Sequence, residues 1–338
     1  MPAEWHPQDA ILLAWPHVAT DWCPMLDEVK MCYRHLITAI VDHEPVLLVT
    51  PDVPATRREL ADIDNGRILY SPIDTNDTWA RDFGPITVID ERGTPVLLDY
   101  KFDAWGMKFA ACLDNLVNRR LRDNGALAAP MVGRQSFVLE GGSIESDGNG
   151  TLMTTSRCLL SPNRNADYDR AQIERQLLHD LGMEKMIWIE NGFLEGDDTD
   201  AHIDTLARFA PHATILYCGA DAPVDAQAQS LLALERELTS ATDREGRHYS
   251  LIKLPTPTPI VDEDGQRLPA TYANFLVTNE KVLVPVYGQE ADDDALALIA
   301  SCFDRNVEGI DCRPLIKQHG SLHCVTMQLP RGTVNFER

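Results

Sequence analysis

The chain has 338 residues and a formal net charge of −22, with 52 acidic residues against 30 Lys and Arg. This balance argues against DNA or RNA as a partner, because phosphate binding needs clusters of Lys and Arg, and it favours a cationic ligand. Hydrophobic residues make up 44% and charged residues 24% of the chain, a composition typical of a folded protein rather than a disordered one.

The first apolar run, residues 10–15, is too short for a signal-peptide core or a membrane span, and no basic segment precedes it. We therefore expect a cytoplasmic protein with no membrane partner. The eight cysteines contain no C-x-x-C pair, which predicts neither a disulfide framework nor a zinc site.

Short strands are predicted from runs rich in Val, Ile, Leu and Thr at 46–50, 86–89, 96–100, 137–139, 151–155, 214–218, 275–278, 282–286 and 325–329. Helices are predicted from amphipathic patterns at 24–42, 54–61, 109–122, 167–181, 224–238 and 291–303. The fold class is mixed α/β, and strand pairs followed by a helix recur as in a pseudo-symmetric architecture. No stretch reads as an interdomain linker, so a single domain over 1–338 is expected.

The first unusual segment, residues 78–85, reads TWARDFGP and places Asp82 just before a predicted strand. Asp82 and Arg81 could form a structural ion pair beside a Gly-Pro turn, or Asp82 could be a site carboxylate. The segment 137–144 reads FVLEGGSI, in which Glu140 ends an apolar strand before two glycines. A solvated Glu beside a Gly-Gly turn is the alternative interpretation of Glu140.

Residues 196–206 read GDDTDAHIDTL and gather four acids and His202 within eight residues. If this segment is a strand, His202 and Asp204 point to the same face. Such crowding calls for a cation, which could be a metal ion, a protonated histidine or a charged substrate. The EF-hand pattern is not matched, because no glycine or closing glutamate stands where it requires them.

Residues 319–328 read HGSLHCVTMQ, a turn that places Cys324 at the start of an apolar strand. A cysteine is more often a buried hydrophobic residue than a nucleophile. The adjacent His323 points away from Cys324 in a strand, so a more distant histidine is the better catalytic partner. Taken together, the four segments supply a Cys, a His and three carboxylates, the residues needed for nucleophilic attack on a cation.

These segments, in this order, resemble the agmatine deiminase family, also called bacterial peptidyl-arginine-deiminase-like, of the guanidino-group-modifying superfamily. The resemblance is carried by EWH at 4–6, WP at 15–16, WARDFGP at 79–85, FDAWG at 102–106, EGG at 140–142, NRN at 163–165, HID at 202–204 and HC at 323–324. Phe83, Ala201 and His319 depart from the Thr, Gly and Gly that are common in the family.

The resemblance implies a five-bladed α/β propeller of pseudo-five-fold ββαβ units around a central pocket. It implies that Cys324 is the nucleophile, His202 the general acid and base, and Glu140 a carboxylate associated with histidine and substrate. It further implies that Asp82 and Asp204 bind the guanidinium group and that Trp79 lines the pocket.

The reaction implied by the resemblance converts agmatine to N-carbamoylputrescine and ammonia, a step towards putrescine, with no cofactor and no metal. The expected partner is thus a small cationic guanidine, and assembly into a homo-oligomer stays open. Peptidyl-arginine or free arginine are alternative substrates, and an amidinotransferase would pass the same intermediate to an amine. A guanidine-binding protein without turnover and a metal-dependent hydrolase that uses Asp197, Asp198, Asp200 and His202 are further alternatives.

Overall fold

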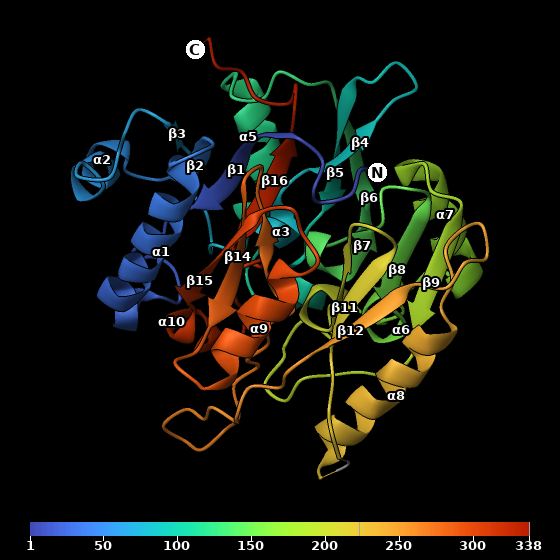
Figure 1. Cartoon of the computed structure of the whole chain (residues 1–338). Helices are drawn as coiled ribbons and strands as arrows, with labels where there is room; N and C mark the ends of the chain where they lie inside the picture. The colour runs from blue at the N-terminus through green and yellow to red at the C-terminus, as the bar shows by residue number, and fades with distance from the viewer. Residues whose placement is uncertain (223, 338) are drawn as a thin grey trace. The chain divides into compact units, whose positions relative to one another are not determined.

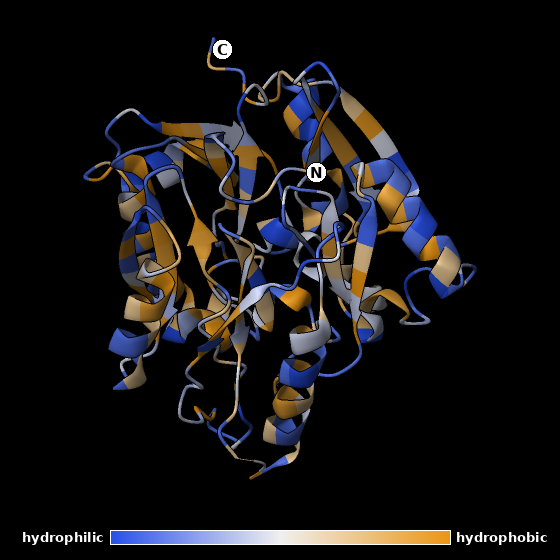
Figure 2. Ribbon diagram, turned by 45° about the vertical axis from the view of Figure 1, so that its right-hand side comes forward, coloured by the Kyte–Doolittle hydropathy of each residue, from blue (hydrophilic) through white to orange (hydrophobic). Residues whose placement is uncertain are grey.

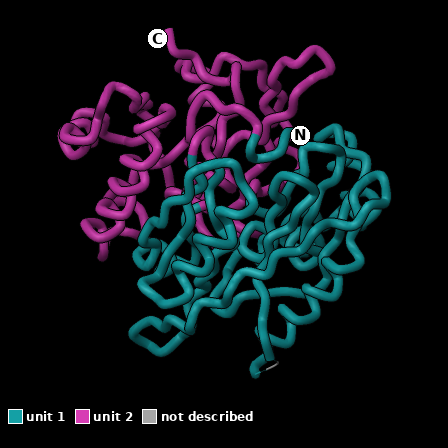
Figure 3. Tube along the Cα trace, viewed as in Figure 1, with its two compact units in different colours: residues 1–5, 142–277, 281–322 teal, residues 6–141, 278–280, 323–338 magenta. Residues whose placement is uncertain are grey.

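The structure is a computed structural model that describes residues 1–222 and 224–337. The chain divides into two compact units (Figure 3). Unit 1 comprises Met1–Trp5, Gly142–Val277 and Lys281–Leu322, and unit 2 comprises His6–Gly141, Thr278–Glu280 and His323–Arg338. The single domain expected from the sequence stays a prediction.

One strand pattern recurs through both units. The strands of residues 1–222 and 224–337 form five sheets, and in each sheet a central strand pairs antiparallel with one neighbour and parallel with the other. A helix connects the two parallel strands every time, because parallel neighbours need a crossover connection. These five ββαβ repeats confirm the mixed α/β class and the repeat unit that the sequence predicts.

Unit 2 holds two of the sheets, with strand orders β16-β1-β2-β3 and β4-β5-β6. Its strands are β1 (Gln8–Ala14), β2 (Val46–Thr50), β3 (Ile68–Pro72), β4 (Ile86–Ile89), β5 (Pro95–Lys101), β6 (Met131–Val138) and β16 (Thr326–Pro330). Its helices are η1 (Cys23–Met25), α1 (Leu26–Val41), α2 (Val53–Glu59), α3 (Ala80–Phe83), α4 (Ala104–Met107), η2 (Asp114–Leu116) and α5 (Val117–Asp123). Figure 1 shows α1 beside β2, on which it packs.

Unit 1 holds the other three sheets, with orders β7-β8-β9, β10-β11-β12 and β13-β14-β15. Its strands are β7 (Ile144–Ser146), β8 (Thr151–Thr155), β9 (Lys185–Ile189), β10 (Ala207–Ala210), β11 (Thr214–Cys218), β12 (Ser250–Leu254), β13 (Leu276–Val277), β14 (Lys281–Val286) and β15 (Asn306–Asp311). Its helices are α6 (Ser156–Leu159), α7 (Arg170–Leu181), η4 (Ile203–Thr205), α8 (Ala226–Ser240), α9 (Ala291–Ala300) and α10 (Arg313–Ile316). The short η3 (Gly141–Ser143) lies where the chain passes from unit 2 to unit 1.

The central strands form the cores of the units. All five residues of β2, β8 and β11 are buried, as expected for strands covered on both faces. The helices are striped in apolar and polar colours in Figure 2, which is typical of helices that turn one face to a sheet. Among the residues that the structure describes, no helix has the length and apolar character needed to cross a membrane.

The predicted strands at 46–50, 86–89, 151–155 and 214–218 are confirmed with the same bounds. The predicted helix at 109–122 is wrong in its first part, because helical structure begins only at η2. Leu113 donates its backbone N–H to the Asn76 side chain at 2.7 Å, which ties this segment to another loop. The strand β1 was not predicted, although it contains most of the apolar run at 10–15, because this run is rich in Ala and Leu rather than in the β-branched residues typical of strands.

Candidate active site

Asp82 lies on α3, a single helical turn in unit 2 whose four residues are all buried. The residue is 3% exposed, and its Oδ2 accepts a hydrogen bond from the indole N–H of Trp105 at 2.9 Å. Trp79 precedes the helix, and its ring centroid lies 5.6 Å from that of Trp22 and 6.4 Å from that of Trp105. Asp82 is thus a buried carboxylate among aromatic rings, an environment that suits a bound cation.

Cys324 lies in the turn before β16, also in unit 2, and is 4% exposed. Its carbonyl oxygen accepts a hydrogen bond from the backbone N–H of Arg81 at 3.1 Å. The Arg81 side chain donates to Gln328 and lies 3.5 Å from the sulfur of Met327, both on β16. The segment of the predicted nucleophile is therefore joined to that of Asp82, although the two are distant in sequence.

Glu140 follows β6 and is fully buried at 0% exposure, so the interpretation as a solvated residue beside a turn is wrong. The next residue, Gly141, packs tightly: a Cβ there would lie 2.2 Å from the Arg81 carbonyl oxygen and 2.9 Å from the Met327 side chain. Only glycine allows this approach. In unit 2 the segments of Asp82, Cys324 and Glu140 thus all contact Arg81 or its neighbours.

His202 and Asp204 lie in unit 1, at the start of and within the 3-10 helix η4. The condition under which both side chains would share one face, a strand at this segment, is not met, because the Thr205 hydroxyl and backbone N–H both donate to the His202 carbonyl and close a tight turn. His202 is 1% and Asp204 is 0% exposed. The Asn274 side-chain amide donates to the Asp204 carbonyl at 3.4 Å, which holds this turn against the chain before β13.

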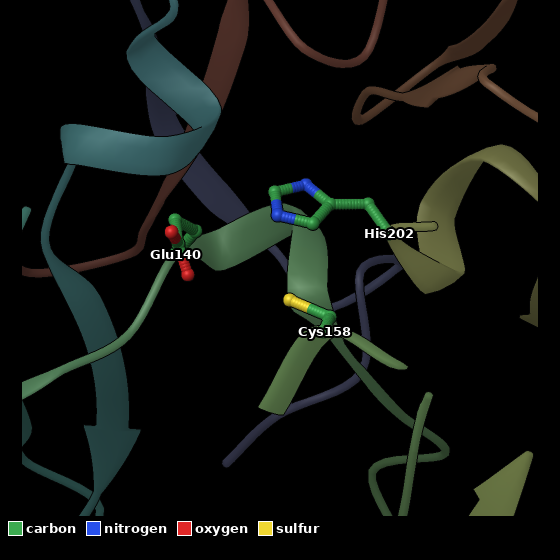
Figure 4. A group of neighbouring side chains, drawn as sticks. All are labelled: Glu140, Cys158 and His202. Atoms are coloured by element: carbon green, nitrogen blue, oxygen red, sulfur yellow. The ribbon is translucent and has the colours of Figure 1, made fainter. Parts of the chain in front are cut away.

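Cys158, a cysteine of unit 1, was not predicted from the sequence to be a site residue. It lies on α6, and its sulfur is within 4.8 Å of a ring nitrogen of His202 (Figure 4). The residue is 0% exposed. The Thr155 hydroxyl anchors both segments, because it accepts from the Cys158 backbone N–H at 3.2 Å and donates to the Ala201 carbonyl at 2.8 Å.

The acidic loop before His202 is organised by its own side chains. Asp197 accepts from the Ala201 backbone N–H at 2.7 Å and from the Thr199 hydroxyl at 2.5 Å. Asp200 forms an ion pair at 2.6 Å with Arg164, whose side chain is 0% exposed. The cation demanded by this crowding is thus supplied in part by Arg164, from the NRN motif at 163–165.

Arg208, on β10 after η4, carries a buried charge close to Asp204. The side chain is 0% exposed and pairs with Glu145 at 2.9 Å and with Glu4. Burial alone would lower the pKa of Arg208, but the carboxylates of Glu145, Glu4 and Asp204 raise it. Arg208 also donates to the carbonyl oxygens on either side of Asn274, at 3.2 Å and 2.7 Å. It therefore supports the residue that holds the Asp204 turn.

The sequence profile of the Porphyromonas-type peptidyl-arginine deiminase family matches residues 1–330. The chain belongs to this family. Its members include guanidino-group deiminases, which are hydrolases. The resemblance predicted from the sequence is confirmed.

Three relatives illustrate the range of names within the Porphyromonas-type deiminases. A crystal structure named "putative arginine deiminase" from Porphyromonas gingivalis is 47% identical with a TM-score of 0.94, over 99% of both chains. A cysteine-to-serine variant of the C. jejuni agmatine deiminase with substrate bound is 36% identical with a TM-score of 0.90, over 98% of this chain and 96% of that one. A "putative agmatine deiminase" from Selenomonas ruminantium is 35% identical over 98% of this chain and 95% of its own length.

Two departures from the pattern of the Porphyromonas-type deiminases have a structural explanation. Ala201 and His319, where glycine is common, have positive φ angles of 63° and 66°. This left-handed conformation favours glycine, which agrees with the expectation from the resemblance that glycine is common at both positions. The His319 ring compensates in part, because its Nδ1 lies 2.7 Å from the Gly196 carbonyl oxygen.

Three residues that lie beside predicted site residues of this deiminase, Trp105, Cys158 and Asn274, could not be identified from the sequence. Trp105 stands in the FDAWG motif at 102–106, so the resemblance pointed to the segment without giving the residue a role. Cys158 and Asn274 carry no local signal, because each lies close to a site residue of a distant segment: Cys158 to His202, and Asn274 to Asp204 through a hydrogen bond.

Proposed function

We propose that this deiminase hydrolyses the guanidino group of agmatine, releasing ammonia and N-carbamoylputrescine. The observation that carries the proposal is in unit 2, where the Arg81 N–H bonds to the Cys324 carbonyl at 3.1 Å. This bond places a cysteine segment next to the buried carboxylate of Asp82. In the proposal, the Cys324 thiol attacks a planar cation that Asp82 and the aromatic rings around it hold.

Substrate binding is assigned to two carboxylates and one aromatic ring. A guanidinium ion is planar and delocalised, so its carbon must be held and polarised before attack. In the proposal Asp82 and Asp204 accept paired hydrogen bonds from its edges and bring the carbon to about 3 to 3.5 Å from the nucleophile. Trp79 lines the pocket for the cation.

In the first half-reaction, the Cys324 thiolate bonds to the guanidino carbon, giving a tetrahedral adduct. His202 protonates the departing nitrogen, which leaves as ammonia, and an amidino-thioether remains on Cys324. Glu140 is assigned to orient His202 and the substrate. In the second half-reaction, water donates a proton to His202 and its oxygen to the carbon, and the C–S bond breaks. The sum is substrate plus water to a carbamoyl amine plus ammonia.

Arginine is the second candidate substrate. It is favoured by the name of the P. gingivalis relative and by the peptidyl-arginine description of the family. The C. jejuni relative named as an agmatine deiminase favours agmatine. Free arginine differs from agmatine by an α-carboxylate, which a binding site with net negative charge would disfavour.

The test offers agmatine, free arginine and an arginyl peptide in parallel to the purified protein, and measures ammonia and the ureido product. We expect the highest kcat/KM with agmatine. A preference for either arginine substrate would reassign the specificity, and ammonia release from none of the three would overturn the proposed function. Product formation with an added amine acceptor tests the amidinotransferase alternative, and turnover after exhaustive chelation tests the metal-dependent one.

A further inference from the structure

The backbone of unit 2 has an unusual conformation at α4, the segment that carries Trp105. Four successive residues have positive φ angles: 55° at Ala104, 57° at Trp105, 83° at Gly106 and 65° at Met107. Only one of the four is a glycine, and side chains on L-residues disfavour this left-handed region. Backbone strain of this kind is retained where surrounding contacts determine it, often beside a functional site.

This turn holds Trp105 in contact with its neighbours. Its ring packs edge-on against Phe102 and Phe109, with centroids at 5.2 Å and 5.8 Å. The turn is closed by the Asp103 side chain, which accepts from the Gly106 N–H at 2.8 Å. Trp105 is only 7% exposed, so both its ring and its N–H have fixed surroundings. The rings position the indole, and the indole N–H is directed at Asp82.

We propose that Trp105 is a positioning residue that sets the plane of the Asp82 carboxylate for the guanidino substrate. The inference rests on the proposed function, in which Asp82 binds the guanidinium group. The indole N–H donates to Oδ2 at 2.9 Å, a charge-assisted bond that restricts rotation of the carboxylate about its side-chain torsions. Paired hydrogen bonds to a guanidinium need that plane aligned, and a misplacement of about 1 Å can reduce the rate about 100-fold.

A purely structural role would require only the shape of the indole. Aromatic packing against Phe102 and Phe109 can be met by a phenyl ring, whereas donation to Asp82 cannot. The two roles are therefore separable by removing the N–H alone. The chain offers a matched control in unit 1, because the Trp188 indole N–H donates to the Glu174 carboxylate at 2.8 Å.

The experiment compares Trp105→Phe with Trp188→Phe in steady-state kinetics on the preferred guanidine, together with thermal unfolding. We expect Trp105→Phe to lower kcat/KM by about 10- to 100-fold. The kcat/KM of Trp188→Phe should stay within about twofold of the wild-type value. In a Cys324→Ser background, calorimetry should show weaker binding of the same guanidine when Trp105 is replaced by Phe.

A double-mutant cycle decides whether Trp105 acts through Asp82. In an Asp82→Asn background, adding Trp105→Phe should lower kcat/KM by less than about threefold, because the acceptor of the indole N–H has already been changed. Equal losses in both backgrounds would overturn the proposal. So would a folded Trp105→Phe protein with wild-type kcat/KM.

If Trp105→Phe does not fold, 3-benzothienylalanine at position 105 keeps the ring shape and removes the N–H. Normal turnover in that variant would overturn the inference, and so would its failure to fold, because the bond would then be structural. A wild-type protein inactive on every guanidine would overturn the proposed function itself. An active wild type with an unaffected variant overturns only the role of Trp105.

Discussion

Asp82 and Asp204 are carboxylates that unit 2 and unit 1, respectively, keep away from solvent, at 3% and 0% exposure. Burial of a carboxylate is costly unless donors or cations compensate for the lost water. Asp82 accepts a hydrogen bond from the Trp105 indole N–H, and Asp204 lies near the Arg208 guanidinium group. A substrate cation would add to this compensation, which is why residues of this kind are good candidates for binding charge.

We expect Cys324→Ser to abolish ammonia release while binding of agmatine stays measurable. A serine hydroxyl is a far weaker nucleophile than a thiolate, but the carboxylates that hold the substrate are unchanged. Turnover is followed by ammonia detection and binding by calorimetry. Cys32→Ser is the matched control, because Cys32 on α1 is also 4% exposed and is not assigned to the site. Near-normal turnover of Cys324→Ser would end the proposed mechanism.

We expect Asp204→Asn to weaken binding and turnover together, because it removes one charged partner of a bidentate contact. A hydrogen bond to a charged group is worth roughly 1.5–3 kcal/mol, which corresponds to a loss of about 10- to 100-fold in kcat/KM. Steady-state kinetics and calorimetry in the Cys324→Ser background measure the two effects. An agmatine affinity equal to that of the parent would contradict the assigned role.

Among the elements, the long strands and helices were easier to predict than the short turns that carry the site. Apolar runs mark β2, β8 and β11 because they are buried along their whole length. In contrast, α3, α4 and η4 are single turns with three or four residues, too short for any periodicity. Their conformations depend on contacts with other segments, such as the bond from Trp105 to Asp82 and the bond from Asn274 to the Asp204 carbonyl.

The loop before α3 is held by η2 through a buried acid, Asp114, which accepts from the backbone N–H of Asn76 at 2.6 Å. Burial raises the pKa of Asp114 from 3.8 to about 7. The folded protein therefore holds this proton more tightly than the unfolded chain does, and unfolding releases it between about pH 4 and pH 7. The protonated Asp114 carboxyl group therefore makes its full contribution to the free energy of unfolding below this pH window. That contribution is lost as the pH rises through the window.

We accordingly expect the free energy of unfolding contributed by Asp114 to fall by on the order of 2 kcal/mol between pH 4.5 and pH 7. Asp114→Asn should flatten this part of the profile, because the side chain no longer titrates. Urea unfolding at a series of pH values measures both slopes. Indistinguishable slopes for the wild type and Asp114→Asn would show that the carboxyl group does not titrate in this range.

At the scale of the molecule, each unit is assembled from segments that are distant in sequence. Unit 2 pairs β1 with β16, from the two ends of the chain. Unit 1 joins Glu4 near the N-terminus to Arg208, and Arg208 to the chain around Asn274. The buried ion pairs of Arg208 therefore report on the integrity of the whole unit.

We expect Arg208→Met to lower the free energy of unfolding by about 3–5 kcal/mol, because it leaves the buried Glu145 without its cation. Arg122→Met is the matched control, since Arg122 pairs with Asp123 at 2.7 Å on the surface, where both side chains are largely exposed. Its expected effect is below about 1 kcal/mol. Equal unfolding midpoints for the two variants in urea would contradict the structural role of the buried pair.

The sequence by itself determined the α/β class, the family, and the residue types available for chemistry. Apolar runs follow from burial, and the motifs around Asp82, Glu140, His202 and Cys324 are contiguous, so both can be read locally. The sequence also predicted that the acidic loop before His202 needs a cation. It did not predict that Arg164 supplies part of that positive charge by pairing with Asp200.

Only the tertiary structure decided which segments meet. The Arg81 bond to Cys324, the Trp105 bond to Asp82 and the pairing of β1 with β16 each join residues far apart in the chain. No local pattern specifies such a pair, because hydrophobic periodicity reports only that a residue is buried. The partner of each buried group is chosen when the segments pack, since a buried polar group must then find its donor or acceptor within the folded chain.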